Sequence, residues 1–201
     1  MIYNILLVGT GGQGIITISN ILAAAALATN LRVIVTQKKG LAQRGGSVVA
    51  QVRIGEVYSP QIPKFSSDSI FSMDINETFK YIDYINKDTR LVVNSKLNEN
   101  KDDSHLSEKE RTQREKIEQL KKILKDNLLL VDADSIAKEK RMDRSANLFL
   151  LGVLFSLDSR INSLLTRDDI VDSIKKNISR NIDSNLQIFV EGIEFLKSDK
   201  S

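Results

Sequence analysis

The chain has 201 residues, of which 41% are hydrophobic and 27% charged, and its formal net charge is +3. This length suits a single domain with a substantial core, and the composition is ordinary for a globular protein. The chain contains no cysteine and only one histidine, His105. These counts exclude thiolate ligation of an iron–sulfur cluster, disulfides and a histidine-rich metal site. We therefore expect any redox centre to come from a bound cofactor or a partner chain.

The apolar runs of the chain are shorter than the roughly 20 residues that a membrane span needs. No secretory signal is evident, because glycines interrupt the apolar start at Gly9. These features predict a cytoplasmic protein that binds no membrane. Residues 1–55 carry five basic residues and no Asp or Glu, which favours an anionic ligand or an acidic partner surface. Nucleic-acid binding is not expected, because clustered stripes of Lys and Arg are missing.

The first quarter of the chain predicts a strand, a helix and a second strand. These three elements occupy residues 3–8, 15–28 and 32–36. A βαβ unit of this kind places its two strands parallel. Residues 47–54 then alternate in hydrophobicity and meet residues 56–59 across Gly55, a pattern that predicts a hairpin and hence a mixed sheet.

The rest of the chain predicts further strands and then a helical end. Strands are expected over residues 69–72, 90–94 and 128–131, and helices over residues 76–85, 145–157, 167–178 and 182–197. A charged insertion, residues 96–126, is expected to hold a surface helix that starts at a capping box of Ser107 and Glu110. We predict an α/β fold: one three-layer, Rossmann-like αβα domain over residues 1–201, with a mixed, mostly parallel sheet and a helical C-terminal third.

A first glycine-rich loop joins the first strand to the first helix. Its residues fit G-x-G-x-x-G and are Gly9, Thr10, Gly11, Gly12, Gln13 and Gly14. Glycines permit close backbone approach, and the helix N-terminus presents unpaired N–H groups to a phosphate. The acidic residue that would hold the ribose of NAD is missing at the end of the second strand, where Lys38 and Lys39 lie. NAD is therefore disfavoured, whereas NADP and a purely structural role in helix–sheet packing stay open.

A second glycine-rich element begins at the carboxyl end of the second strand. Its candidate ligand-contacting residues are Gln43, Arg44, Gly45 and Gly46. The carboxyl ends of parallel strands share one edge of a sheet, where ligands of α/β proteins usually bind. The planar guanidinium of Arg44 suits phosphate or carboxylate. The two loops are therefore predicted to converge on one crevice that takes an anionic cofactor.

Together these motifs resemble the gamma-type subunit family of the 2-oxoacid:ferredoxin oxidoreductases. The resemblance rests on GTGGQG at residues 9–14, GLAQRGGSVV at 40–49, VRIG at 52–55 and YSP at 58–60. Further similarity lies in residues 68–85, 131–137 and 147–152 and at Asn185 and Gly192. The sequence QRGGSV at residues 43–48, followed by YSP at 58–60, is most similar to the small (beta) subunit of the indolepyruvate type.

The resemblance implies a multi-subunit enzyme that oxidatively decarboxylates a 2-oxoacid, here indolepyruvate or a related aryl 2-oxoacid, to an acyl-coenzyme A. It implies a large partner subunit that holds thiamine diphosphate, magnesium and iron–sulfur clusters and passes electrons to ferredoxin. The chain itself lacks a Gly-Asp-Gly motif and cluster cysteines, so a non-catalytic subunit that binds no cofactor alone is expected. In the assembled enzyme, coenzyme A or thiamine diphosphate is the expected ligand of the loops, and a homodimer of heterodimers is left open.

Two other functions stay open at this point. The same glycine loops could serve a stand-alone NADP- or flavin-binding protein, which would carry its cofactor through purification. A non-enzymatic interaction module is the third interpretation.

Overall fold

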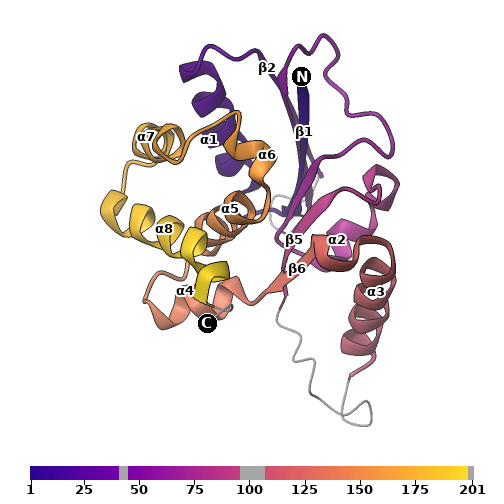
Figure 1. Ribbon diagram of the computed structural model, residues 1–201. Helices are drawn as coiled ribbons and strands as arrows, with labels where there is room; N and C mark the ends of the chain where they lie inside the picture. Colours follow the sequence, from indigo (N-terminus) through magenta and orange to yellow (C-terminus); the bar gives the residue numbers. More distant parts are fainter. Residues whose placement is uncertain (41–44, 96–106, 199–201) are drawn as a thin grey trace.

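The computed structural model describes residues 1–40, 45–95 and 107–198, with a six-stranded sheet between two layers of helices (Figure 1). The strands are β1 (Ile2–Thr10), β2 (Val33–Lys39), β3 (Ser47–Gly55), β4 (Ser69–Ser72), β5 (Arg90–Asn94) and β6 (Leu128–Val131). Their order in the sheet is β2-β3-β1-β4-β5-β6. Strands β1, β4, β5 and β6 are parallel neighbours, and β3 is antiparallel to both β1 and β2. The predicted α/β class and mixed, mostly parallel sheet are confirmed.

The predicted hairpin between residues 47–54 and 56–59 is wrong. Strand β3 instead pairs with β1 over its whole length, from Ile2 opposite Gly55 to Thr10 opposite Ser47, and with β2 on its other side. Residues 56–59 form no strand, because β3 already has a partner along each edge. Strands β1 and β2 run in the same direction, as predicted, but β3 lies between them.

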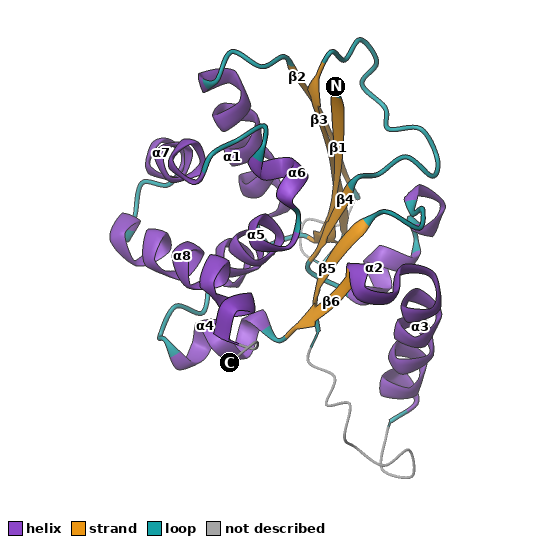
Figure 2. Cartoon of the chain, viewed as in Figure 1, coloured by secondary structure: helices purple, strands orange, loops and turns teal. Residues whose placement is uncertain are grey.

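One layer of helices covers the face of the sheet that holds the larger hydrophobic core (Figure 2). It contains α1 (Ile15–Ala28), α4 (Ala133–Glu139), α5 (Ala146–Leu157), α6 (Ser159–Asn162), α7 (Arg167–Asn177) and α8 (Ile182–Ser198). Helix α5 is buried on all sides, because it lies between β4 and β5 on one side and α8 on the other. The short helices α4 and α6 were not expected from the sequence.

The opposite face of the sheet is covered by α2 (Ile75–Phe79) and α3 (Glu108–Leu124) and holds the smaller core. The single helix predicted over residues 76–85 is split into α2 and the 3₁₀ helix η1 (Ile82–Tyr84). Helix α3 begins at the predicted capping box of Ser107 and Glu110 and ends at the short 3₁₀ helix η3 (Lys125–Asn127). Residues 96–106 of the predicted insertion lie outside the described residues.

Candidate functional site

The two glycine-rich loops lie against each other at the carboxyl edge of β1. The N–H of Gly11 donates to the carbonyl oxygen of Gly46 over 2.8 Å. Ser47, at the start of β3, donates its hydroxyl to Glu77 Oε2 over 2.6 Å and so ties the second loop to α2. The antiparallel pairing of β1 with β3 brings the loops together, because it places Thr10 opposite Ser47. Gln43 and Arg44, also predicted site residues, lie outside the described residues.

Gln13 fixes the shape of the first loop from within. Its Oε1 accepts from the N–H of Thr10 over 2.7 Å, and its Nε2 donates to the carbonyl oxygen of Met73 over 3.2 Å. A Cβ atom on Gly9 would lie 2.7 Å from Gln13 Oε1, so a larger residue there would displace the Gln13 side chain from its hydrogen bonds. The first half of the loop is thus occupied by internal contacts, and its ligand-binding capacity lies in the second half.

That second half leads into a helix N-terminus with no protein cap. Gly14 is the N-cap residue of α1 with a φ of 77°, no side chain caps the helix, and its first turn contains no acidic residue. A Cβ atom on Gly14 would lie 2.0 Å from Asn147 Nδ2, so glycine is required by both conformation and space. The N–H groups of the first turn have no acceptor within the helix, and the helix dipole makes this end attractive to an anion.

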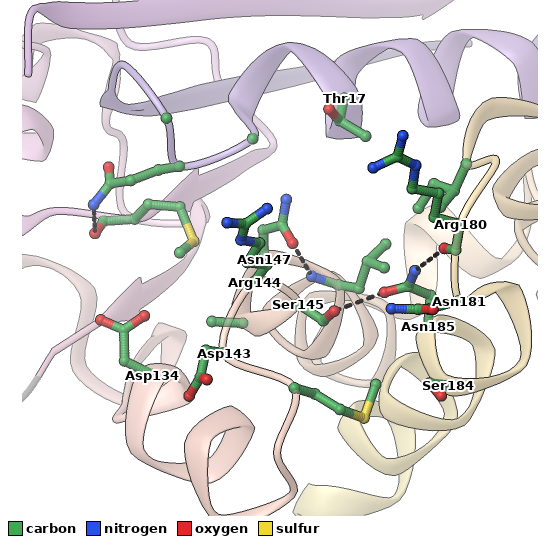
Figure 3. Close-up of a pocket in the computed structure, with 18 of the residues that line it drawn as sticks. Thr17, Asp134, Asp143, Arg144, Ser145, Asn147, Arg180, Asn181, Ser184 and Asn185 are labelled. Carbon is green, nitrogen blue, oxygen red and sulfur yellow. Dashed lines mark hydrogen bonds between the residues drawn. The ribbon is translucent and has the colours of Figure 1, made fainter. Parts of the chain in front are cut away.

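A cavity of about 990 Å³ opens in front of this helix end (Figure 3). Its walls come from the start of α1, the start of α5 with the residues before it, and the connection from α7 to α8. Of the predicted site residues, Gly12, Gln13 and Gly14 line it. Gly9, Thr10, Gly11, Gly45 and Gly46 do not line it, and they shape or brace the loops instead.

The charged side chains of the cavity are mainly basic. Arg141, Arg144 and Arg180 line it together with Asp134 and Asp143. None of the three arginines forms an ion pair with any residue that the structure describes. All three arginines are exposed, so water or a ligand can reach them. Together with the start of α1, they give the cavity the character of an anion site.

A buried hydrogen-bond chain joins two of the cavity walls. Ser145, the N-cap residue of α5, donates its hydroxyl to Asn185 Oδ1 over 2.6 Å, and Asn185 Nδ2 donates to the carbonyl oxygen of Arg180 over 3.1 Å. The Ser145 side chain is therefore committed to α8 rather than to its own helix. This chain holds the connection between α7 and α8 in place next to the start of α5.

Sequence reasoning missed the contribution of the C-terminal third to this site. Asn147, Arg144 and Arg180 line the same cavity as Gly12 and Gly14, although they follow them by more than a hundred residues. The available signal was the similarity of residues 147–152, which pointed to no particular role. Within the described residues, no group of His, Asp and Glu side chains is placed to hold a metal ion. None of the helices described is both long and apolar enough to cross a membrane.

The fold is that of a Rossmann-like α/β protein, with a cavity lined by the start of α1 and by three arginines at the carboxyl edge of its sheet. The pyruvate ferredoxin/flavodoxin oxidoreductase family matches residues 4–195, and the chain belongs to this family. The prediction of the family, and with it of an oxidoreductase subunit, is thereby confirmed.

Relatives and solved structures agree with this assignment. The indolepyruvate oxidoreductase subunit IorB of Archaeoglobus fulgidus is 31% identical over 190 residues, covering 94% of this chain and 92% of that one. The pyruvate oxidoreductase subunit PORC of Thermotoga maritima has a TM-score of 0.69 at 23% identity, covering 96% of both chains. A 2-oxoglutarate:ferredoxin oxidoreductase of Magnetococcus marinus, with 2-oxoglutarate, coenzyme A and succinyl-CoA bound, has a TM-score of 0.69 at 20% identity. The match covers 98% of this chain but 31% of that one, and both structural likenesses show a shared fold.

Proposed function

We propose that this chain is the small, non-catalytic subunit of a ferredoxin-dependent oxidoreductase that decarboxylates indolepyruvate or a related aryl 2-oxoacid to an acyl-coenzyme A. The observation that carries the proposal is the similarity to IorB of Archaeoglobus fulgidus over nearly the full length of both chains. A cytoplasmic location, transfer of electrons to ferredoxin and a homodimer of heterodimers belong to the same proposal.

The composition of the chain favours a non-catalytic role. Without cysteine, the chain cannot hold iron–sulfur clusters through thiolates, so these belong to a large partner subunit. That subunit would also hold thiamine diphosphate and magnesium, which supply the nucleophile for decarboxylation. The hydrogen bonds of Gln13 and Ser145, which lie beside the cavity, hold the first loop and connect the start of α5 to α8.

The contribution of this chain would be to bind and orient an anionic cofactor at the subunit interface. The donor groups fit such a ligand, since Gly12 has open space beside its Cα and the start of α1 has no protein cap. Gly9–Gly14 and Gly45–Gly46, with Gln43 and Arg44, are proposed to form this contact directly or by bracing. Coenzyme A and thiamine diphosphate both carry the diphosphate that this chemistry suits.

The proposal is tested by purifying the tagged chain from its native cell and identifying the chains that accompany it. A large, cysteine-rich, thiamine diphosphate-binding chain in stoichiometric amount is expected. The complex should reduce ferredoxin with indolepyruvate and coenzyme A, and its activity should depend on both.

Two results would contradict the proposal. Purification of the chain alone would remove the subunit role, and a flavin absorbance spectrum or bound NADP would then favour the stand-alone nucleotide-binding protein. A complex that turns over small aliphatic 2-oxoacids but no aryl substrate would keep the subunit role and reject the substrate class.

A further inference from the structure

Strand β2 has one edge that pairs with no other strand of the described chain. It stands at one end of the sheet and has seven residues, whereas β6 at the other end has four. All seven residues are at least partly exposed, and the sequence VIVTQKK contains no proline. Natural proteins usually shorten, cover or interrupt such an edge, because its free N–H and C=O groups can pair with another strand. The edge of β2 is therefore a candidate binding surface.

The register of β2 with β3 shows which backbone groups of β2 are free. The N–H of Gly55 donates to the carbonyl oxygen of Arg32 over 2.8 Å, just before β2 begins. Hydrogen-bonded pairs alternate along an antiparallel ladder, so the even-numbered residues of β2 direct their backbone groups to β3. The odd-numbered residues Val33, Val35 and Gln37 direct theirs to the open edge, where no described residue bonds to them. These three residues present the donors and acceptors that an added strand needs.

An aromatic ring and three cations border this edge. Arg32 directly precedes β2, and its guanidinium carbon lies 4.6 Å from the centroid of the Tyr58 ring, which belongs to a residue that is 80% exposed. The hydroxyl of Tyr58 donates to Glu56 Oε2 over 3.4 Å. Lys38 and Lys39, at the other end of β2, are exposed and form no ion pair with any residue that the structure describes. Tyrosine and arginine are enriched among the residues that dominate binding at protein interfaces.

The charge along the edge decides what kind of strand pairs with it. Like charges that face each other in a sheet are unfavourable, and opposite charges are favourable. Residues 1–55 contain no Asp or Glu. Pairing with β2 of a second copy would therefore gather the three cations of each copy along one seam, with no acid in either strand. An extended acidic segment of another chain would neutralise these cations and use the same backbone groups.

We propose that the open edge of β2 pairs with an extended, acidic segment of the large partner subunit, which adds a strand to the sheet beside β2. Tyr58 and Arg32 contact one end of this segment, and Lys38 and Lys39 bind its carboxylates at the other end. The inference rests on the proposed function for the existence of that subunit, whereas the surface and the charge of the contact follow from β2 itself.

The test is hydrogen exchange with single-residue resolution, measured by mass spectrometry on the free chain and on its purified complex with the large subunit. The amides of Val33, Val35 and Gln37 should exchange about tenfold more slowly in the complex, as expected when each gains a hydrogen bond. The even-numbered amides of β2, which already bond to β3, should be protected in both samples.

Three outcomes would overturn the inference in different ways. A complex in which the odd-numbered amides of β2 exchange as fast as in the free chain would reject this surface and leave the proposed function standing. Purification of the chain alone would remove both. Protection of the same amides in a free chain that sediments as a dimer would assign the edge to a second copy.

The decisive variant is Val35→Pro. Proline is tolerated in an edge strand where the missing N–H faces outward, and the N–H of Val35 makes no bond to β3. The variant should raise the Kd for the large subunit about tenfold, the effect of a lost backbone hydrogen bond and of a ring that blocks pairing. The control Val35→Ala shortens the same side chain but keeps the N–H, so its Kd should match the wild type. Equal Kd values for both variants would overturn the backbone pairing.

A second pair of variants tests the charge of the partner and does not disturb the strand backbone. Lys38→Glu should raise the Kd for the large subunit about tenfold at low salt, and less at high salt, because a like charge then faces the acidic segment. The control is Lys87→Glu, which makes the same charge change at an exposed position before β5. If Lys38→Glu and Lys87→Glu had equal effects, net charge would explain them and the acidic segment would be rejected.

Discussion

Gly152 of α5 and Gly192 of α8 face each other where the two helices cross, with no room for a side chain at either position. A Cβ atom on Gly192 would lie 2.1 Å from the carbonyl oxygen of Phe149 and 3.1 Å from the Cα of Gly152. A Cβ atom on Gly152 would lie 2.1 Å from the carbonyl oxygen of Phe189. The two backbones are therefore in direct contact, which sets the position of α8 and of the cavity wall that leads into it.

The replacement Gly192→Ala should separate the helices and destabilise the protein. Overpacking in a core costs about 1–3 kcal/mol, and the better helix propensity of alanine offsets up to about 1 kcal/mol of that cost. We expect a net loss of about 2 kcal/mol in the free energy of unfolding, measured by urea denaturation. The control Gln187→Ala, on the exposed side of the same helix, should stay within about 0.5 kcal/mol of the wild type. If Gly192→Ala and Gln187→Ala were equally stable, the crossing of α5 and α8 would have to shift to accommodate the added methyl group.

The replacement Thr17→Glu should separate ligand binding from folding. Thr17 lies in the first turn of α1 and lines the cavity. A carboxylate there interacts favourably with the helix dipole, which contributes about 0.3–1 kcal/mol, but it repels an anionic ligand. The variant should therefore unfold at the same or a higher urea concentration, while the KM of the assembled enzyme for the anionic cofactor rises about tenfold or more, as expected when an anion site loses a contact to a charged group.

The matched control for that experiment is Asn20→Glu. Asn20 lies on the same helix, is exposed and does not line the cavity. It should leave the KM for the cofactor unchanged. If both variants raise KM equally, the effect would come from net charge rather than from the cavity.

The replacement Asp158→Asn should weaken the protein at neutral pH more than in acid. Asp158 is 1% exposed and accepts hydrogen bonds from the hydroxyls of Tyr3 and Ser69 and from the guanidinium of Arg160. Burial raises the pKa of Asp158, but the hydrogen bonds from Arg160, Tyr3 and Ser69 outweigh it and hold that pKa below its ordinary value. Arg160 is 35% exposed and keeps Asp68 as a partner, so the change should cost about 1–3 kcal/mol, as expected when buried donors lose a charged acceptor.

The pH dependence follows from the direction of that pKa shift. The contribution of Asp158 is complete above the unfolded pKa, about 4, and disappears as the pH falls through the lower folded pKa. Burial raises the pKa of the neighbouring Asp68, so the effect of Asp68 on stability has the opposite sign. Urea unfolding at pH 7 and near pH 3 should therefore show a large difference between wild type and Asp158→Asn at pH 7 and a smaller one in acid. A difference independent of pH would refute this account.

The replacement Gln13→Ala should loosen the first glycine loop. It leaves the N–H of Thr10 and the carbonyl oxygen of Met73 without their partner, at a cost of about 1–3 kcal/mol. The free energy of unfolding should fall by that amount, and faster amide exchange at Thr10 should report the opened loop. Gln119→Ala, at an exposed position of α3, is the control and should leave exchange at Thr10 unchanged.

The elements that the sequence predicted well are those with local signals. The strands at 69–72, 90–94 and 128–131 are short apolar runs bounded by polar residues, and the structure has them at these limits. The capping box at Ser107 and Glu110 is likewise a local pattern, and both of its hydrogen bonds are present. Such features depend on a few neighbouring residues and need no knowledge of the rest of the chain.

The failures depend on contacts that the hydrophobic pattern does not record. The guanidinium of Arg53 donates to the carbonyl oxygens of Ser59 and Gln61 over 2.8 Å, and Gln51 Oε1 accepts from the N–H of Ile62 over 2.7 Å. These polar side chains on β3 hold the following segment as a loop, which the hydrophobic pattern could not reveal. The candidate site shows the same limit. The glycine loops could be identified from the sequence, whereas the proximity of the Asn147 amide to Gly14 is visible only in the fold.

The position of β3 between β1 and β2 constrains the order in which the chain can assemble. During synthesis β1 appears first, yet both of its neighbours, β3 and β4, lie at residues 47–72. Until those residues are available, an apolar strand retains two unpaired edges, which are templates for association with other chains. Fragments that end before residue 47 should therefore aggregate, and the nascent amino-terminal quarter should be the part of this protein that most needs a chaperone.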